Sequence, residues 1–275
     1  MATITILNLS LTEEFKNIYL SNSKIHYSEN NKDYTFSSED KKFLIFKVSE
    51  LIADFIIKTE ERKIIKHLIN RDYHYFSNLE KKYILNSTLE ILNTHSDDDI
   101  LKLLFLLRRR ALVRSSLISF FETTNTLDFH GFVSFGLKNY KEYMSEFIEK
   151  SVDSYIIQKE YSNFISMLQF FVNNQKIKSS KIHLIVNENF TYTILDSFQN
   201  DITDQCFNEF YLDDPNKQLN NEDLLLSSLI SLSPKKIYIQ IHADKYNRKI
   251  LETIKHVFEN RVIMKENSWF PVVCR

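Results

Sequence analysis

Arginine, histidine and aspartate stand at a few positions where they could bind a ligand or assist a reaction. Four arginines, Arg108, Arg109, Arg110 and Arg114, interrupt the otherwise apolar residues 99–121. A guanidinium group is a planar fork of donors that fits a carboxylate or a phosphate. Arg110 and Arg114 are one helical turn apart and form one patch. They are therefore the candidate site for an anion or a partner.

The arginines also have a purely structural interpretation. Consecutive residues lie about 100° apart around a helix, so three neighbouring arginines cannot share one solvent-facing side. Their long side chains can extend to the surface or pair with acids later in the chain, such as Glu142, Glu146 and Glu160. We favour this interpretation over a binding site.

Histidines mark three further positions. His242 and Asp244 follow a predicted strand, and the carboxyl ends of parallel strands are where α/β sheets bind ligands. His130 precedes Gly131, and a buried hydrogen-bonding role is favoured for it over a ligand role. His183 is expected on the exposed face of a strand.

Recognised catalytic and cofactor-binding signatures are missing from the sequence. The chain has two glycines, Gly131 and Gly136, so it has no glycine-rich phosphate loop. It has no HExxH or CxxC motif and no nucleophile elbow. We therefore predict no catalytic residue, cofactor or metal, and a non-enzyme is the simpler interpretation.

The composition is that of a globular protein with little net charge. The 275 residues are 43% hydrophobic and carry a net charge of −1, which gives no electrostatic reason to expect a nucleic-acid partner. No stretch approaches the roughly 18 apolar residues of a transmembrane segment, and the first residues do not resemble a signal peptide. Cys206 and Cys274 form no disulfide framework, so we expect a cytoplasmic protein.

Apolar periodicity predicts a helical middle of the chain. The expected helices span about 38–70, with a possible break near 58–61, then 78–92 and 99–121. Ser37 and Asp40 resemble a capping box for the first of them. The last is apolar nearly all round, so we expect it to be the most buried helix, packed against residues 140–172, with Leu104 and Leu107 in the core.

A longer helical pattern occupies residues 140–172. Its apolar residues change phase near 156–159, where we expect a kink or two consecutive helices. Residues 127–138, which contain both glycines, are expected to form a turn and a short, tightly packed segment. Gly131 should be needed for a positive φ or a close approach, and Gly136 less so.

Strands are expected at both ends of the chain. The N-terminal candidates are residues 3–9, 24–28 and 33–36. In the C-terminal part, residues 181–187 and 191–196 predict a hairpin, and Asn221 caps a helix to Leu232. Residues 236–242, 244–259 and 261–265 read as strand, helix and strand, which indicates a βαβ unit with parallel strands.

These elements predict an α+β fold, with a central all-helical region packed with a C-terminal α/β unit that contains a small mixed sheet. The expected parts are a strand-rich segment over residues 1–36, a helical region over 37–175 and an α/β region over 176–275.

One family resemblance is carried by three stretches. They are GFVSFGLKNY (131–140), EKSVDSYIIQKEYSNFISMLQFFV (149–172) and NEDLLLSSLISLSPKKIYI (221–239), and they resemble the YtxC-like family of sporulation proteins from endospore-forming bacteria. The family pattern has an arginine where this chain has Gly136, and clustered cysteines where it has Cys274 alone. The resemblance implies a role in sporulation and no defined activity.

Two functions fit these observations. The first is a cytosolic protein that acts in spore formation through contacts with a protein partner that the sequence does not identify. The alternative is an enzyme or small-ligand-binding protein with its site at the strand ends near His242 and Asp244. Nucleic-acid binding is a distant third, because the basic cluster is short and lies in an apolar helix.

Overall fold

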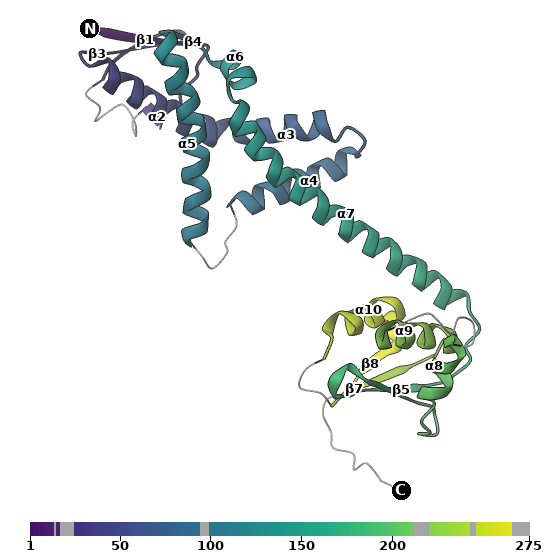
Figure 1. The fold of residues 1–275 in the computed structure, drawn as a ribbon. Helices are drawn as coiled ribbons and strands as arrows, with labels where there is room; N and C mark the ends of the chain where they lie inside the picture. Colours follow the sequence, from purple (N-terminus) through teal and green to yellow (C-terminus); the bar gives the residue numbers. More distant parts are fainter. Residues whose placement is uncertain (14, 17–24, 94–98, 212–219, 243–245, 266–275) are drawn as a thin grey trace. The chain divides into compact units, whose positions relative to one another are not determined.

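Two compact units make up the chain, residues 1–156 and residues 157–275 (Figure 1). The computed structural model describes residues 1–13, 15–16, 25–93, 99–211, 220–242 and 246–265. Within these residues each unit combines helices with a four-stranded sheet, so the fold class is α+β, as predicted. The expected boundaries after residues 36 and 175 stay a prediction.

The first unit is built around a mixed sheet with the strand order β2-β3-β1-β4. Its strands are β1 (Ala2–Leu7), β2 (His26–Asn30), β3 (Asp33–Ser38) and β4 (Thr126–Asp128). β1 pairs antiparallel with β3 and parallel with β4. β4 was not predicted, because three residues are too few to show a two-residue period.

The longer helices of the first unit pack around this sheet and one another. They are α2 (Lys41–Thr59), α3 (Glu61–Asp72), α4 (Asn78–Asn93), α5 (Asp99–Thr123) and the beginning of α7 (Lys138–Asn174). The predicted break near residues 58–61 is confirmed by the boundary between α2 and α3. The expected capping box is wrong, because Asp40 itself caps α2 by accepting hydrogen bonds from the N–H groups of Lys42 and Phe43, while Ser37 belongs to β3.

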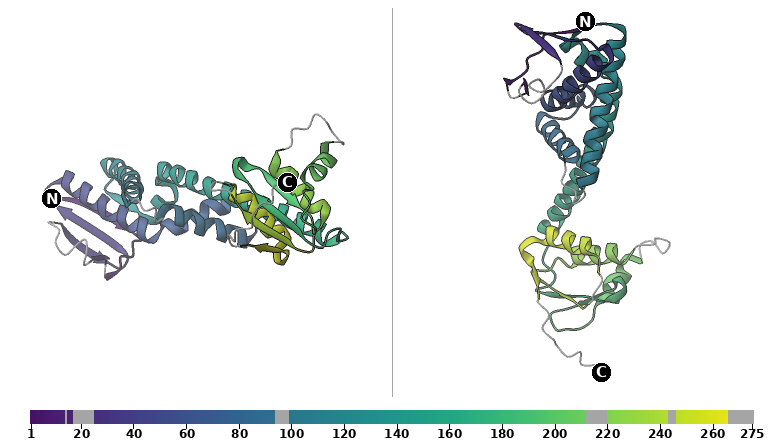
Figure 2. Two further views of the ribbon diagram at one scale, coloured as in Figure 1. Left: turned by 90° about the horizontal axis from the view of Figure 1, so that it is seen from below. Right: turned by 90° about the vertical axis from the view of Figure 1, so that its left-hand side faces the viewer.

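The central helix of the first unit is α2, not α5. It contacts β1 and β3 as well as α5, and Figure 2 shows the strands lying against it. α5 packs chiefly against α2 rather than against residues 140–172. Leu104 and Leu107, expected in the core, are 53% and 48% exposed. The fully buried apolar residues among those described in α5 are Val113, Leu117 and Phe121, and Phe105 packs against the core while partly exposed.

Both glycines lie in a tight helical segment that follows β4. It consists of α6 (Phe129–Gly131) and a π-helical turn, η1 (Phe132–Gly136). The carboxylate of Asp128 caps the segment by accepting the N–H of Gly131 at 2.8 Å. Neither glycine has a positive φ, so that expectation for Gly131 was wrong. A Cβ would come within 2.7 Å of the Asp128 carboxylate at Gly131 and within 2.5 Å of the Phe132 ring at Gly136.

Gly136→Ala is expected to lower the free energy of unfolding more than Gly131→Ala. A Cβ on Gly136 would lie 2.5 Å from the buried ring of Phe132, and such overpacking costs about 1–3 kcal/mol. A Cβ on Gly131 would meet the carboxylate of Asp128, which is exposed and can turn away. Urea unfolding of both variants checks this order, and a larger loss for Gly131→Ala would restore the order predicted from the sequence.

α7 is one uninterrupted helix from Lys138 to Asn174, so the break expected near residues 156–159 is wrong. Its early buried residues, from Tyr140 to Val152, belong to the core of the first unit. Its later ones, Ile165, Leu168 and Val172, belong to the core of the second. The change of phase therefore marks a change of core, not an end of the helix. Among the described helices, none is long and apolar enough to span a membrane.

The second unit contains a mixed sheet with the strand order β6-β5-β7-β8. Its elements are β5 (Ile182–Val186), β6 (Tyr192–Leu195), α8 (Thr203–Tyr211), α9 (Asn221–Leu232), β7 (Ile237–Ile241), α10 (Arg248–Phe258) and β8 (Val262–Met264). The hairpin β5–β6 and the parallel pair β7–β8 are confirmed. Asn220, not Asn221, caps α9 by accepting the N–H of Asp223 at 2.7 Å.

The helices α9 and α10 cover one face of this sheet (Figure 1). Both crossovers, from β5 to β7 and from β7 to β8, run in the same direction across the sheet. Right-handed crossovers in one direction place their helices on the same side. That face carries the buried side chains of Leu184, Ile237 and Ile239.

Candidate functional site

The four arginines of α5 face different partners. Arg109 is 3% exposed and donates to Glu61 of α3, with 2.5 Å between Nη1 and Oε1. Arg110 forms a two-point ion pair with Asp54 of α2. The guanidinium groups of Arg108 and Arg114 lie over the rings of Tyr143 and Phe46. Pairing with acids therefore holds for two arginines, but the partners are on α2 and α3 instead of being Glu142, Glu146 or Glu160.

Arg109 and Glu61 form the centre of a buried hydrogen-bonded hub. The hydroxyl of Tyr140 donates to Glu61 at 2.7 Å, and Arg109 also donates to the carbonyl oxygen of Leu92 at 3.3 Å. The hub thus joins α3, α4, α5 and α7. Burial, together with the neighbouring Glu61 carboxylate, raises the pKa of Tyr140 far above its ordinary value. Tyr140 therefore stays a hydrogen-bond donor at physiological pH.

Arg110 and Arg114, the predicted patch, both turn towards α2. Arg110 is held by Asp54, and its side chain is 41% exposed. Arg114 lies 5.3 Å from the centre of the Phe46 ring. Both contacts hold α5 against α2, so the two arginines have a structural role here. An anion at this patch would have to compete with the carboxylate of Asp54.

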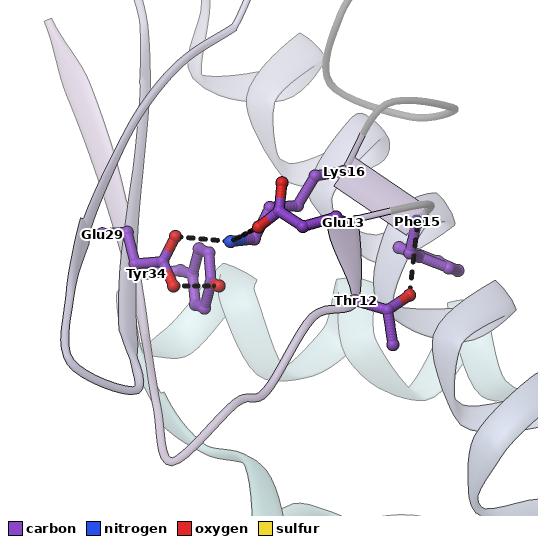
Figure 3. Close-up of polar contacts among 6 residues, drawn as sticks. All are labelled: Thr12, Glu13, Phe15, Lys16, Glu29 and Tyr34. Carbon is purple, nitrogen blue, oxygen red and sulfur yellow. Dashed lines mark hydrogen bonds and ion pairs between the residues drawn. The ribbon is translucent and has the colours of Figure 1, made fainter.

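A second charge cluster ties the segment after β1 to the hairpin of β2 and β3 (Figure 3). The ammonium group of Lys16 lies 2.8 Å from Glu13 and 2.7 Å from Glu29, and the hydroxyl of Tyr34 donates to Glu29 at 2.6 Å. The two carboxylates raise the pKa of Lys16, and the contact with Lys16 lowers that of Glu29. The contacts link the segment after β1 to the hairpin, and the positive charge of Lys16 is fully engaged by the two carboxylates.

His130 and Gly131 are in a different place from the arginine patch. His130 is exposed on α6, with its ring 5.6 Å from the ring of Phe129, so the buried role favoured for it was wrong. α6 is a helix of a single turn, and the imidazole of His130 is exposed to solvent on it. Gly131 contributes its N–H to the Asp128 cap. Within the described contacts, neither residue meets Arg110 or Arg114.

At the carboxyl edge of the second sheet, His242 directly follows β7. Its side chain is exposed, and its N–H donates to the carbonyl oxygen of Val186 at 2.9 Å. Asp244 lies outside the described residues. Tyr192 is in register with Val186 at the same edge, and its buried hydroxyl has no hydrogen-bond partner within the described part of the chain. Burial, with a smaller effect of Glu222, raises the pKa of Tyr192 to about 12.

His183 is buried, contrary to the expectation of an exposed position. It is 8% exposed and stacks on Tyr238 of the neighbouring strand, with 5.1 Å between ring centres. The two residues are directly opposite in the β5–β7 register, so the larger ring covers the smaller one. Burial lowers the pKa of His183 and favours its neutral form. No group of three metal-ligating side chains occurs among the described residues.

One apolar stripe on α7 is exposed, and sequence reasoning missed it. Phe164, Met167 and Phe171 are 43%, 49% and 48% exposed, and we call them the α7 stripe. Their spacing of three and four residues places them along one side of the helix. The sequence predicts Phe164 and Phe171 within a single buried stripe, whereas the structure buries only the residues next to them.

Polar contacts fix this part of α7 against α10. The hydroxyl of Tyr161 lies 3.2 Å from that of Thr253, and the amide of Gln169 donates to Glu259 at 2.8 Å. Both bonds are within the second unit, on the side of α7 that also carries the buried residues. The α7 stripe is therefore presented by a helix whose rotation about its axis is fixed.

Comparison with known proteins points to one family. The sequence model of the YtxC-like family matches residues 46–263, which is most of the chain. A relative, described as uncharacterized protein YtxC of Bacillus subtilis (strain 168), is 23% identical over 214 residues, which cover 78% of this chain and 74% of that protein. No solved structure matches the chain. The matched range includes α5, the α7 stripe and His242.

Proposed function

The chain belongs to the YtxC-like family, and from that premise we propose that it is a cytoplasmic sporulation protein that acts by binding another protein. The resemblance to this family implies sporulation. The cytoplasmic location is supported by the use of cysteine, with Cys206 and Cys274 far apart in the sequence. Arg110, Arg114, His130 and Gly131 stay candidates for the contact, because all lie in the matched range.

The single observation that carries the binding role is the α7 stripe. Large apolar side chains that are exposed together on one face of a helix mark interaction sites more often than isolated ones do. Helices that insert into an apolar groove of a partner use anchors at positions such as i, i+3 and i+7. Phe164, Met167 and Phe171 have this spacing. The partner that fits is therefore a protein with an apolar groove.

Removing two anchors should lower spore yield without unfolding the protein. We expect Met167→Ser with Phe171→Ser, introduced in the native host, to reduce yield, because interface energy concentrates in a few large apolar anchors. The matched control is Phe190→Ser with Phe198→Ser, since these residues are 51% and 83% exposed in the same unit. Circular dichroism of the purified variants checks folding. A folded stripe variant with normal yield would overturn the proposal.

A second candidate is an enzyme or small-ligand binder with its site near His242 and Asp244. Its support is the buried, unpartnered hydroxyl of Tyr192 at the same sheet edge. Asn247, which caps α10, also donates to Glu222 there at 2.6 Å. A folded variant with His242→Ala and Asp244→Ala that fails to support sporulation would favour this candidate, because catalytic side chains act through their own atoms.

A further inference from the structure

A basic groove lies between α3 and α4 of the first unit. It is a pocket of about 600 Å³ lined by Arg62, Lys66, Ile69 and Asn70 of α3 and by Asn78, Lys81, Lys82 and Leu85 of α4. Four of these side chains are cationic and two are amides, and none of the described residues that line the pocket carries a carboxylate. We call this pocket the basic groove.

Helical spacing explains why these side chains share the groove. Arg62, Lys66 and Asn70 are four residues apart, so they lie along one side of α3. Asn78 and Lys82 have the same spacing on α4, which packs against α3. Two basic stripes on neighbouring helices thus face one space.

The groove cations take part in no ion pair among the described residues. Some lysines elsewhere in the unit do have acidic partners: Lys47 lies 2.9 Å from Glu50, and Lys63 lies 2.7 Å from Glu60. The described ion pairs include none of the four groove cations, and the ammonium group of Lys81 reaches only the carbonyl oxygen of His74, at 3.4 Å. Like charges gathered without counter-charges repel one another, so an anion in the groove would relieve this repulsion.

We propose that the basic groove binds the phosphate groups of a small organic phosphate. Lysine, arginine and amide N–H groups are donors that suit phosphate oxygens. A volume of about 600 Å³ is in the range of small-molecule sites. A nucleic-acid strand or a membrane would instead need a broad basic surface, whereas the chain as a whole carries a net charge of −1.

An adjoining pocket can hold the organic part of this ligand. It has a volume of about 910 Å³ and shares Arg62 with the basic groove. The apolar side chains of Leu89, Ile91 and Leu106 line part of it, and Asn86 and Ser87 supply polar groups. Its charged side chains are Lys58, Glu61, Arg62, Glu90 and Arg109, of which Glu61 and Arg109 pair with each other. The apolar side chains can pack against the organic part of a ligand, and the amide and hydroxyl groups can hydrogen-bond to it. Arg62 stands where the phosphate end and the organic end of the ligand would meet.

The test is calorimetric titration of the full chain at fixed ionic strength with inorganic tripolyphosphate and with adenosine triphosphate. Both should bind, and Lys66→Ser with Lys82→Ser should weaken both at least about tenfold, because a single charge-assisted contact is worth about that factor. Lys63→Ser with Lys138→Ser is the matched control. It removes two exposed lysines that have acidic partners outside the groove, and it should leave both affinities unchanged.

Further titrations distinguish between the possible ligands. Adenosine triphosphate should bind more tightly than tripolyphosphate, and Asn86→Ala with Ser87→Ala should remove only that advantage. Equal affinity of the two probes would overturn the assignment of the adjoining pocket. Single-stranded DNA and vesicles that contain phosphatidylserine should not bind at the same ionic strength. Tripolyphosphate binding that is absent, or that survives in the Lys66/Lys82 variant, would overturn the proposal for the groove.

Discussion

Replacing Glu61 with alanine is expected to lower the free energy of unfolding by about 3–5 kcal/mol, the cost of breaking a buried ion pair by removing one partner. Glu61 is 6% exposed and accepts hydrogen bonds from both Arg109 and Tyr140. Without its carboxylate, the charge of Arg109 is buried with no counter-charge in the hub. The hydroxyl of Tyr140 also loses its acceptor. Both defects destabilise only the folded state.

Urea unfolding of a double-mutant cycle measures this effect. The singles are Glu61→Ala and Arg109→Met, and the double variant should lose much less than their sum, because removing both charges leaves no buried unpaired charge. The control is Lys47→Ala, which breaks the exposed pair with Glu50 and should cost less than about 1 kcal/mol. A Glu61→Ala loss as small as the control would show that apolar packing alone holds these helices.

The charge partners could not be predicted from the sequence. The helical angle of about 100° per residue correctly indicates that Arg108, Arg109 and Arg110 point in different directions. It does not say what each of them meets. Glu61 is 48 residues before Arg109 and Asp54 is 56 before Arg110, so these pairs depend on how α5 packs against α2 and α3. Glu142, Glu146 and Glu160, which the sequence offered as possible partners, are not the partners of Arg109 and Arg110.

The elements themselves were largely predictable, because each has a local signal. The βαβ unit was found from a two-residue period, a 3.6-residue period and another two-residue period, and the parallel pairing of β7 with β8 confirms it. Elements with weak local signals were missed. β4 has three residues, and η1 has the wider turn of a π-helix, which no apolar period indicates. α7 was wrongly divided because its two halves join two different cores.

The candidate functional surfaces, too, could be predicted only where they have a local signal in the sequence. The positions of His242 and the strand ends followed from topology, since a parallel strand and its carboxyl edge can be derived from a βαβ pattern. The α7 stripe and the basic groove could not be found in this way. Phe164 and Ile165 are adjacent apolar residues, yet one is exposed and the other buried. The groove needs α3 and α4 side by side, although its cations are visible in the sequence as ordinary surface residues.

Phe121→Ala is expected to lower the free energy of unfolding by about 3–5 kcal/mol, whereas Leu104→Ala should change it by no more than about 0.5 kcal/mol. Phe121 is fully buried near the end of α5, with its ring 5.8 Å from that of Phe120. Removing the ring leaves a cavity in addition to the lost transfer energy. Leu104, on the same helix, is 53% exposed and leaves no cavity when truncated.

Urea unfolding of these two variants decides between two descriptions of α5. If α5 were the most buried helix, as its apolar circumference suggests, Leu104→Ala would cost about 2–5 kcal/mol, the usual loss for a core leucine. In the structure, Phe121 of α5 is buried in the core and Leu104 of the same helix is exposed. The helix that contacts both the sheet and α5 is α2. A large loss at Leu104 would therefore mean that this part of α5 is covered in solution. A large loss at Phe121 alone would confirm that Phe121 is in the core and that Leu104 is at the surface.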